Sequence, residues 1–126
     1  MMMILSVAAG GALGAVLRYS FNLMTIGLLG HGFPWGTLLV NVLGSFLMGV
    51  LVTIFALSWT PSVEIRAFLT IGLLGAFTTF STFSLDAVTL WEQGSSVQAL
   101  GYTIGSVVLS ILGLVAGIMV VKAVVS

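Results

Sequence analysis

The part of this chain best suited to handling an ion is residues 78–84, "TTFSTFS", where five hydroxyl side chains accompany two phenylalanines. The rings of Phe80 and Phe83 have electropositive edges. The hydroxyls that follow the first ring belong to Ser81, Thr82 and Ser84. Hydroxyl donors beside ring edges make an uncharged lining that favours a small anion without binding it tightly. Conduction requires this balance, because an ion must both enter a pore and leave it.

Composition identifies the surroundings of this segment as a membrane. Of the 126 residues, 60% are hydrophobic and only 5% are charged, and the mean hydropathy is +1.31. An ordinary soluble domain has roughly 25% charged residues. The formal net charge is zero, so there is no electrostatic case for a nucleic-acid partner. The absence of cysteine excludes disulfides and thiolate metal sites.

The charged residues divide the chain into stretches that can cross a bilayer, since a spanning helix needs about 20 apolar residues. We expect spans at residues 3–29, 35–58, 66–92 and 96–123. Together they make residues 1–126 a single all-α membrane domain of four transmembrane helices. The first span is too long for a secretory signal and lacks its basic start, so we interpret it as mature structure.

The basic residues near the span ends give only a weak preference for one orientation in the membrane. An even number of spans predicts that both termini lie on one side. Arg66 and Lys122 would lie on that side, whereas Arg18 would lie toward the other. So small a bias allows insertion in both orientations, and an antiparallel homodimer follows as a hypothesis.

The third span is expected to break near residues 75–79. In residues 72–84, two glycines precede threonines, serines and phenylalanines, which all form helices less readily than alanine or leucine. Non-helical backbone inside a membrane must be buried in protein or line a wet cavity, and its free carbonyls suit a cation such as sodium. The alternative is an unbroken helix whose hydroxyls bond to the carbonyls one turn earlier.

Other polar residues recur four apart, and such positions share one face of a helix. The stripes consist of Thr37, Asn41 and Ser45; of Tyr102, Ser106 and Ser110; and of Arg18 with Asn22. Each stripe alone is explained by hydrogen bonding between helices. Three stripes on three spans indicate a polar path through the protein.

Sixteen glycines require a further explanation, because glycine is a poor helix former. Three pairs are spaced four apart, and this spacing lets helix backbones approach closely. The pairs are Gly10 with Gly14, Gly101 with Gly105, and Gly113 with Gly117. We expect these faces to lie at contacts between helices.

Three motifs occur in order along the chain: "GALGAVLRY" at 11–19, "WGTLLVNVLGSFLMG" at 35–49 and "GLLGAFTTFSTFS" at 72–84. Through them the sequence resembles the Fluc, or CrcB, family of fluoride channels over essentially its whole length. The resemblance implies a passive, fluoride-selective channel that exports fluoride across the bacterial inner (plasma) membrane. It also implies an antiparallel homodimer with two pores and one central sodium ion.

The resemblance further implies roles for individual residues. Backbone carbonyls of Gly75 and Thr78 from both subunits would hold the sodium ion. Phe80 and Phe83 would supply ring edges to fluoride, and Asn41 an amide donor. The hydroxyl residues expected along the path are Ser81, Thr82, Ser84, Thr37, Tyr102, Ser106 and Ser110.

Two charged residues stand close to this expected path. By the same resemblance Arg18 would lie near the aqueous vestibule; the alternative is a side chain that extends from the helix end to the lipid headgroups. The family often has a glutamate two residues after "STFS", where this chain has the shorter Asp86. The reach of this carboxylate toward the pore mouth should therefore be reduced.

Other functions fit the sequence less well. A small four-helix proton-coupled transporter of the multidrug type has the same size, but it needs a carboxylate within the membrane, and the first two spans contain none. A purely structural membrane protein would explain the glycine pairs but not the clustered hydroxyls. We expect no enzyme, because one histidine, no cysteine and three carboxylates near span ends provide no catalytic pair or metal cluster.

Overall fold

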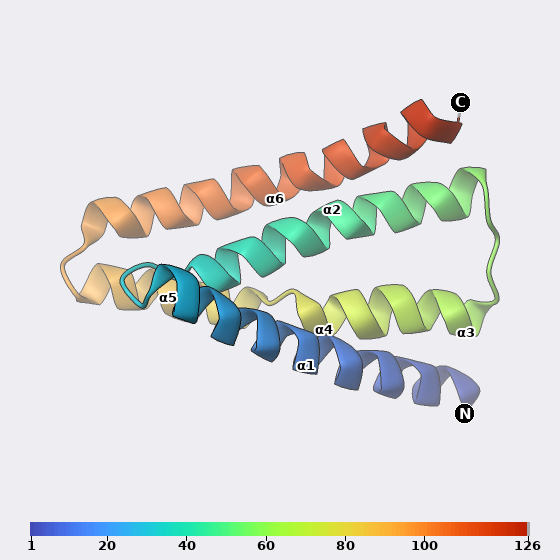
Figure 1. Ribbon diagram of the computed structural model, residues 1–126, viewed down its shortest axis with the longest axis horizontal. Coiled ribbons are helices and arrows are strands. Elements are labelled where there is room, and N and C mark those ends of the chain that lie inside the picture. Colours follow the sequence, from blue (N-terminus) through green and yellow to red (C-terminus); the bar gives the residue numbers. More distant parts are fainter. Residues whose placement is uncertain (126) are drawn as a thin grey trace.

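The structure is a computed structural model that describes residues 1–125, and its four spans lie along roughly one axis and alternate in direction (Figure 1). Four helical stretches are long and apolar enough to cross a membrane: Met2–Leu29, Trp35–Leu57, Val63–Glu92 and Ser96–Val125. The described residues form no strand. The all-α, four-span prediction is therefore confirmed. Both ends of the chain lie at the same end of the molecule, as an even number of spans requires.

The first two spans are single helices, α1 (Met2–Leu29) and α2 (Trp35–Leu57), and the last is α6 (Ser96–Val125). Tight turns separate the spans at two places. Gly30, with φ of 82°, ends α1, and Gly94, with φ of 84°, lies between the third and fourth spans. Glycine suits both positions, because a side chain would be strained at positive φ.

The third span consists of four segments: α3 (Val63–Arg66), the π-helix η1 (Ala67–Leu74), α4 (Gly75–Phe77) and α5 (Phe80–Glu92). It starts at Val63 rather than at residue 66, because the Ser62 hydroxyl caps the helix by accepting from the Ile65 N–H at 3.3 Å. Between α4 and α5, Thr78 and Thr79 have extended backbone. The predicted break is confirmed, and the unbroken-helix alternative is wrong.

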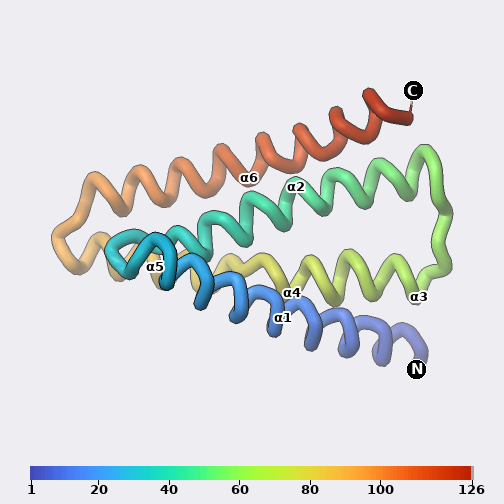
Figure 2. The backbone as a smooth tube through the Cα atoms, viewed as in Figure 1, coloured from blue at the N-terminus to red at the C-terminus, as the bar shows by residue number. Residues whose placement is uncertain are grey.

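The helices pack as two pairs, α2 along α6 and α1 along η1 and α4, as the backbone trace in Figure 2 also shows. Glycines make both approaches possible. An added Cβ at Gly14 would collide with the carbonyl oxygen of Leu73, and one at Gly117 with that of Phe46. Gly10 and Gly113 are also at contacts, so two of the three predicted glycine pairs are confirmed. The exception is the remaining pair, Gly101 and Gly105, which faces open space within this chain.

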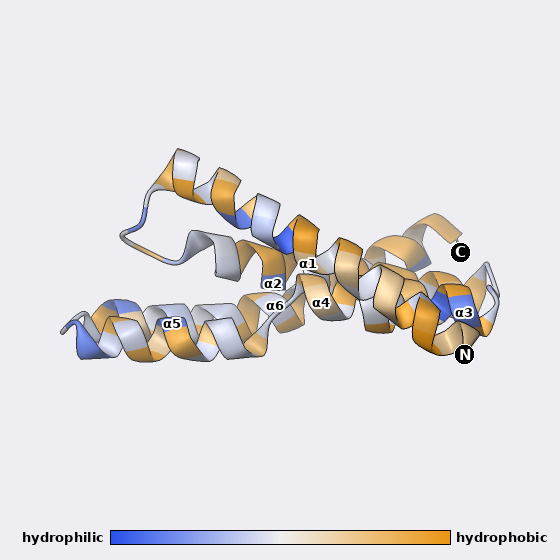
Figure 3. Cartoon of the chain, turned by 90° about the horizontal axis from the view of Figure 1, so that it is seen from below, coloured by the Kyte–Doolittle hydropathy of each residue, from blue (hydrophilic) through white to orange (hydrophobic). Residues whose placement is uncertain are grey.

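Apolar side chains bury only a small core in this chain and otherwise face outward. The core lies among α2, α5 and α6 and consists of Leu38, Phe83, Leu90, Ala99 and Tyr102. Many large apolar side chains are exposed, and Figure 3 shows hydrophobic residues along every span, as expected for helices in contact with lipid or another chain. The same view shows α1 and the start of α2 diverging from α5 and α6 at one end.

Candidate ion pathway

The break in the third span is the feature around which the predicted polar residues gather. Thr78 has φ −85° and ψ 160°, and Thr79 has φ −153° and ψ 123°. The next helix, α5, restarts at Phe80 because the Thr79 hydroxyl accepts from the Thr82 N–H at 3.2 Å, a typical N-cap contact. Two consecutive extended residues free backbone polar groups that a membrane cannot hydrate.

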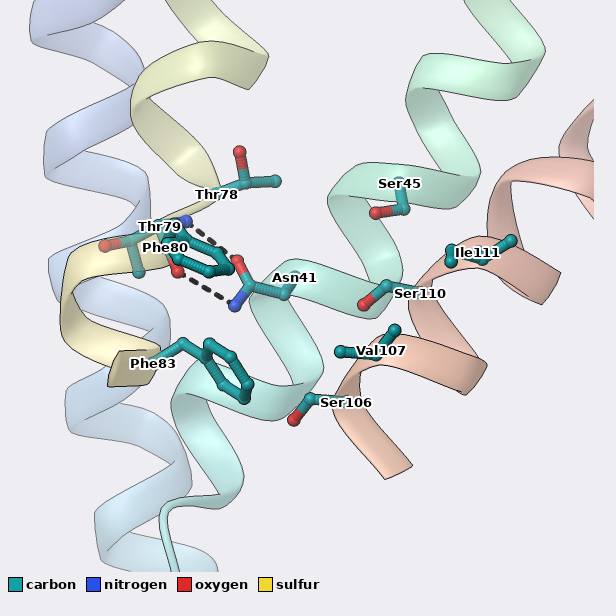
Figure 4. A pocket seen from close by; sticks show the side chains of 10 residues that line it. All are labelled: Asn41, Ser45, Thr78, Thr79, Phe80, Phe83, Ser106, Val107, Ser110 and Ile111. Atoms are coloured by element: carbon teal, nitrogen blue, oxygen red, sulfur yellow. Dashed lines mark hydrogen bonds between the residues drawn. The ribbon is translucent and has the colours of Figure 1, made fainter. Parts of the chain in front are cut away.

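Asn41 on α2 satisfies part of that backbone through two hydrogen bonds to one residue. Its Oδ1 accepts from the Thr79 N–H at 2.7 Å, and its Nδ2 donates to the Thr79 carbonyl at 3.0 Å (Figure 4). A side-chain amide has two N–H donors, so one of them stays available to an ion. Asn41, expected from the resemblance to donate to an ion, thus also bridges the break, a role that the sequence did not indicate.

A pocket of about 290 Å³ lies beside the break, and we call it the break pocket. No charged side chain is among its lining residues, which come from α2, the third span and α6. They are Asn41, Ser45, Thr78, Thr79, Phe80, Phe83, Ser106, Val107, Ser110 and Ile111. Figure 4 shows Asn41 directed at the break from α2, with Ser106 and Ser110 projecting from α6. Residues of two polar stripes and of the break thus line one cavity.

Two hydroxyl residues in the lining, Ser45 and Thr79, were not among the expected site residues. Ser45 belongs to the stripe of Thr37 and Asn41, and its spacing was a usable signal for a pocket role. Thr79 contributes through its position at the break, and its bonding to Asn41 on another span is a tertiary property.

Ser106 has the most distinctive environment of these hydroxyls. It is 4% exposed, and its Oγ has no hydrogen-bond partner among the described residues. A buried hydroxyl without a partner is unfavourable by about 1–3 kcal/mol. A polar species in the break pocket would relieve this cost by accepting from the hydroxyl.

The two phenylalanines differ strongly in exposure although both line the break pocket. Phe80 is 77% exposed, whereas Phe83 is 7% exposed and packs on Tyr102 with ring centroids 5.3 Å apart. The Phe80 and Phe83 centroids are 5.5 Å apart with an angle of 50° between the planes. Phe83 therefore belongs to both the core and the pocket, and Phe80 stands on an open wall.

Two further pockets continue from the break pocket toward the loop between α1 and α2. The middle pocket, about 180 Å³, shares Thr79 with the break pocket and is also lined by Arg18, Thr37 and Thr82. The end pocket, about 240 Å³, shares Thr37 and Thr82 with the middle pocket and is lined by Asp86 at the diverging end of the helices. The shared residues connect the break to that end of the molecule by a series of polar cavities.

Arg18 extends inward rather than along the helix end toward the headgroups. Its Nε donates to the Ala76 carbonyl at 3.0 Å, and its side chain lines the middle pocket. The carbonyl lies at the last turn before the break, where unpaired carbonyls give a helix its negative end. The Arg18 guanidinium therefore hydrogen-bonds to backbone next to the break.

The remaining expected path residues lie outside the three pockets. Tyr102 is 1% exposed, and its hydroxyl donates to Asp86 Oδ2 at 3.2 Å. Ser84 Oγ donates to the Phe80 carbonyl one turn earlier, at 2.9 Å, and Ser81 Oγ lies 3.4 Å from the Thr79 hydroxyl. Both serines are exposed. Within a single chain these three hydroxyls are thus engaged with protein groups.

Gly75 and Thr78 flank the last turn before the break. Outside the regular helices, no hydrogen bond found in residues 1–125 reaches the carbonyl oxygen of either residue. The described residues also contain no group of three or more His, Cys, Asp or Glu side chains able to hold a metal ion. The two carbonyls fit a hard cation, which prefers oxygen ligands.

Four apolar spans, with a broken helix beside an uncharged pocket of polar and apolar side chains, define a small multi-pass membrane protein. A family model described as "CrcB-like protein, Camphor Resistance (CrcB)" matches residues 5–118. The chain belongs to this family, as its resemblance predicted. In a bacterium such a protein lies in the inner membrane.

Several similar proteins match nearly the whole chain. One from Nitrobacter winogradskyi is 50% identical over 121 residues, covering 96% of both chains. One from Rhizobium leguminosarum bv. trifolii is 49% identical over 123 residues, covering 98% of both. One from Rhodospirillum centenum is 51% identical over 129 residues, covering 100% of both. All three are named Fluoride-specific ion channel FluC.

Proposed function

We propose that this chain forms a passive, fluoride-selective ion channel that exports fluoride across the membrane. The observation that carries the proposal is the break pocket, which is lined by five hydroxyl residues, one amide, two phenylalanine rings and two aliphatic side chains, and by no charged side chain. The similar proteins named fluoride-specific ion channels support the same substrate.

The physical chemistry of fluoride suits such a lining. Fluoride is small and strongly hydrated, so a pore must replace its water with several hydrogen-bond donors. Ser106 has a free hydroxyl and Asn41 one free N–H, and the edges of Phe80 and Phe83 add weak positive potential. A full positive charge at this point would hold the anion too strongly for rapid release.

We also propose that two antiparallel copies assemble around two such paths. Phe80 lines the break pocket yet is 77% exposed, so one chain leaves its wall open toward a neighbour. The weak distribution of Lys and Arg supports insertion in both orientations. Tags on the termini should be accessible from both sides of the membrane, and access from one side only would contradict this arrangement.

A sodium ion at the centre of that dimer is the third part of the proposal. The carbonyls of Gly75 and Thr78 would hold it, since both lie beside the break and accept no hydrogen bond outside the regular helices of residues 1–125. The positive charge of the ion would stabilise these carbonyls outside a regular helix. Replacing external and internal sodium by a large organic cation should lower fluoride flux.

The function itself is tested by fluoride efflux from liposomes that contain the purified protein, followed with a fluoride electrode. Fast release of fluoride, little release of chloride from matched vesicles, and no requirement for a proton gradient are expected. Absence of release from folded, reconstituted protein would overturn the channel proposal.

The rival functions are weaker. A multidrug-type proton-coupled transporter is not favoured, because the similar proteins are named channels and α1 and α2 contain no Asp or Glu. Efflux that depended on an opposing proton gradient would favour it again. Membership of a family of ion channels likewise points away from an enzyme.

A further inference from the structure

The backbone around the break has an unusual distribution of hydrogen bonds, and three side chains account for it. In a regular helix each carbonyl accepts from the N–H four residues later. Four such pairs would span the break: Gly75 with Thr79, Ala76 with Phe80, Phe77 with Ser81, and Thr78 with Thr82. In all of them except Phe77 with Ser81, a side chain takes the place of one partner.

The carbonyl of Gly75 is left free because its helical donor is used elsewhere. The Thr79 N–H donates to Asn41 Oδ1 at 2.7 Å instead. Asn41 lies on α2, 38 residues away in sequence. Its second bond, from Nδ2 to the Thr79 carbonyl at 3.0 Å, fixes the orientation of the amide.

The carbonyl of Thr78 is left free in the same way. The Thr82 N–H donates to the Thr79 hydroxyl at 3.2 Å, the cap that starts α5. Two carbonyls lie between them in sequence, those of Ala76 and Phe77, and that of Ala76 has a side-chain partner. It accepts from Arg18 Nε at 3.0 Å, across 58 residues of sequence.

We propose that Asn41 and the Thr79 hydroxyl divert two backbone donors so that the Gly75 and Thr78 carbonyls are free to bind a cation, while Arg18 holds the Ala76 carbonyl away. The three are positioning residues of the cation site, and this inference rests on the sodium ion of the proposed function. Hydrogen-bond pairing decides which carbonyls stay free. A backbone group without a partner in a membrane is unfavourable, so a carbonyl remains free only where no N–H can reach it.

Arg18 places a fixed positive charge near this site, and its guanidinium occupies one carbonyl of the break. The Arg18 guanidinium has five N–H donors and no acceptor, so it competes for carbonyls rather than for the cation. By occupying the Ala76 carbonyl it keeps that oxygen from a cation. Arg18 would then be an organising residue of the break rather than an attractor of anions at an entrance.

Thr79 gives the sharpest test, because its side chain can be changed while the backbone amide that bonds Asn41 remains. Thr79→Ala removes the hydroxyl cap, and Thr79→Ser keeps it. Thr70→Ala is a matched control, since Thr70 lies on the same span and its hydroxyl bonds back to the Arg66 carbonyl at 2.7 Å, away from the break. Asn41→Ala is a second variant, and it removes the side chain that accepts from the Thr79 N–H.

The measurement is equilibrium binding of radioactive ²²Na⁺ to purified protein, with fluoride efflux measured in parallel at varied sodium and constant ionic strength. Thr79→Ala should raise the half-saturating sodium concentration roughly five-fold, the equivalent of about 1 kcal/mol for a lost cap. Asn41→Ala should raise it as well, and Thr79→Ser and Thr70→Ala should match the parent. Hydrogen exchange of residues 78–82 should be faster in Thr79→Ala than in Thr79→Ser.

The outcomes separate this inference from the proposed function. Sodium binding that is equal in the parent, Thr79→Ala and Asn41→Ala would overturn the inference even if the parent conducts fluoride. A parent that binds sodium and responds to these variants but releases no fluoride would sustain the inference and overturn the channel. A parent that binds no sodium would overturn both the inference and the sodium part of the proposed function. Fluoride efflux would still test the channel proposal independently.

Discussion

The Tyr102 hydroxyl on α6 donates to Asp86 Oδ2 on α5 across 3.2 Å, at the edge of the core that joins these helices. The Tyr102 ring packs edge-on against Phe33, with centroids 5.5 Å apart, and tilted against Phe83. The polar stripe on α6 predicted that Tyr102 lines the ion path. In the structure its hydroxyl donates to the Asp86 carboxylate instead. In this chain it links two spans and fixes Phe83, which lines the break pocket.

This pair predicts a measurable coupling. Tyr102→Phe and Asp86→Ala should each lower the free energy of unfolding by about 1–3 kcal/mol, because each removes a hydrogen bond to a charged group. The double variant should lose less than the sum by at least about 0.5 kcal/mol. Unfolding in detergent, followed by circular dichroism for all four proteins, measures the cycle. Strict additivity would show that the two residues act independently.

The two phenylalanines should separate conduction from stability. Phe80→Ile should reduce fluoride efflux at least about tenfold, equivalent to about 1.4 kcal/mol in the barrier, because the ring edge is lost from the break pocket. The free energy of unfolding should fall less than in Phe83→Ile, since the Phe80 side chain is 77% exposed within one chain. Efflux from liposomes and thermal unfolding measure the two effects.

Phe83→Ile should reduce efflux and also destabilise the protein, because Phe83 is 7% exposed and packs on Tyr102. Leu85→Ile is the control for both variants, being on α5, exposed and outside the three pockets. Parent-like efflux from both phenylalanine variants would remove the rings from the mechanism.

Ser106 should show opposite effects on stability and function. Ser106→Ala removes a buried hydroxyl that has no partner among the described residues, so the free energy of unfolding should rise by about 1 kcal/mol. Fluoride efflux should fall, because the hydroxyl is a donor in the break pocket. Ser84→Ala is the comparison, since Ser84 bonds to its own helix and lies outside that pocket. A Ser106→Ala protein that conducts like the parent would show that its hydroxyl does not serve the ion.

Two neighbouring glycines on α1 should respond differently to the same change. Gly14→Ala should destabilise the protein by about 1–3 kcal/mol, because the new Cβ would meet the Leu73 carbonyl and force α1 away from the third span. Gly11→Ala, with nothing within 4 Å of the new Cβ, should be neutral or stabilising by about 0.5–1 kcal/mol. Thermal unfolding of both variants in detergent checks the prediction. Equal effects would mean that the α1 packing is looser than the structure has it.

Local properties of the sequence determined the membrane class, the four spans and the position of the break. Apolar length decides whether a segment can cross a bilayer, and this is read directly from composition. The break at Thr78 and Thr79 follows two glycines and occurs among residues with weak helix propensity, which are also local features. The motifs that carry the family resemblance are likewise linear.

Partners across helices depended on the tertiary structure. Helical periodicity put Asn41, Arg18 and Tyr102 on polar stripes, but it could not say that they bond to Thr79, Ala76 and Asp86. Those choices depend on how α1, α2 and α6 cross the third span, and the crossings depend on which glycines meet a backbone. Gly14 and Gly117 do so, whereas Gly101 and Gly105, with identical spacing, face open space within the chain. Spacing along one helix defines a face, and only the packed structure determines what that face contacts.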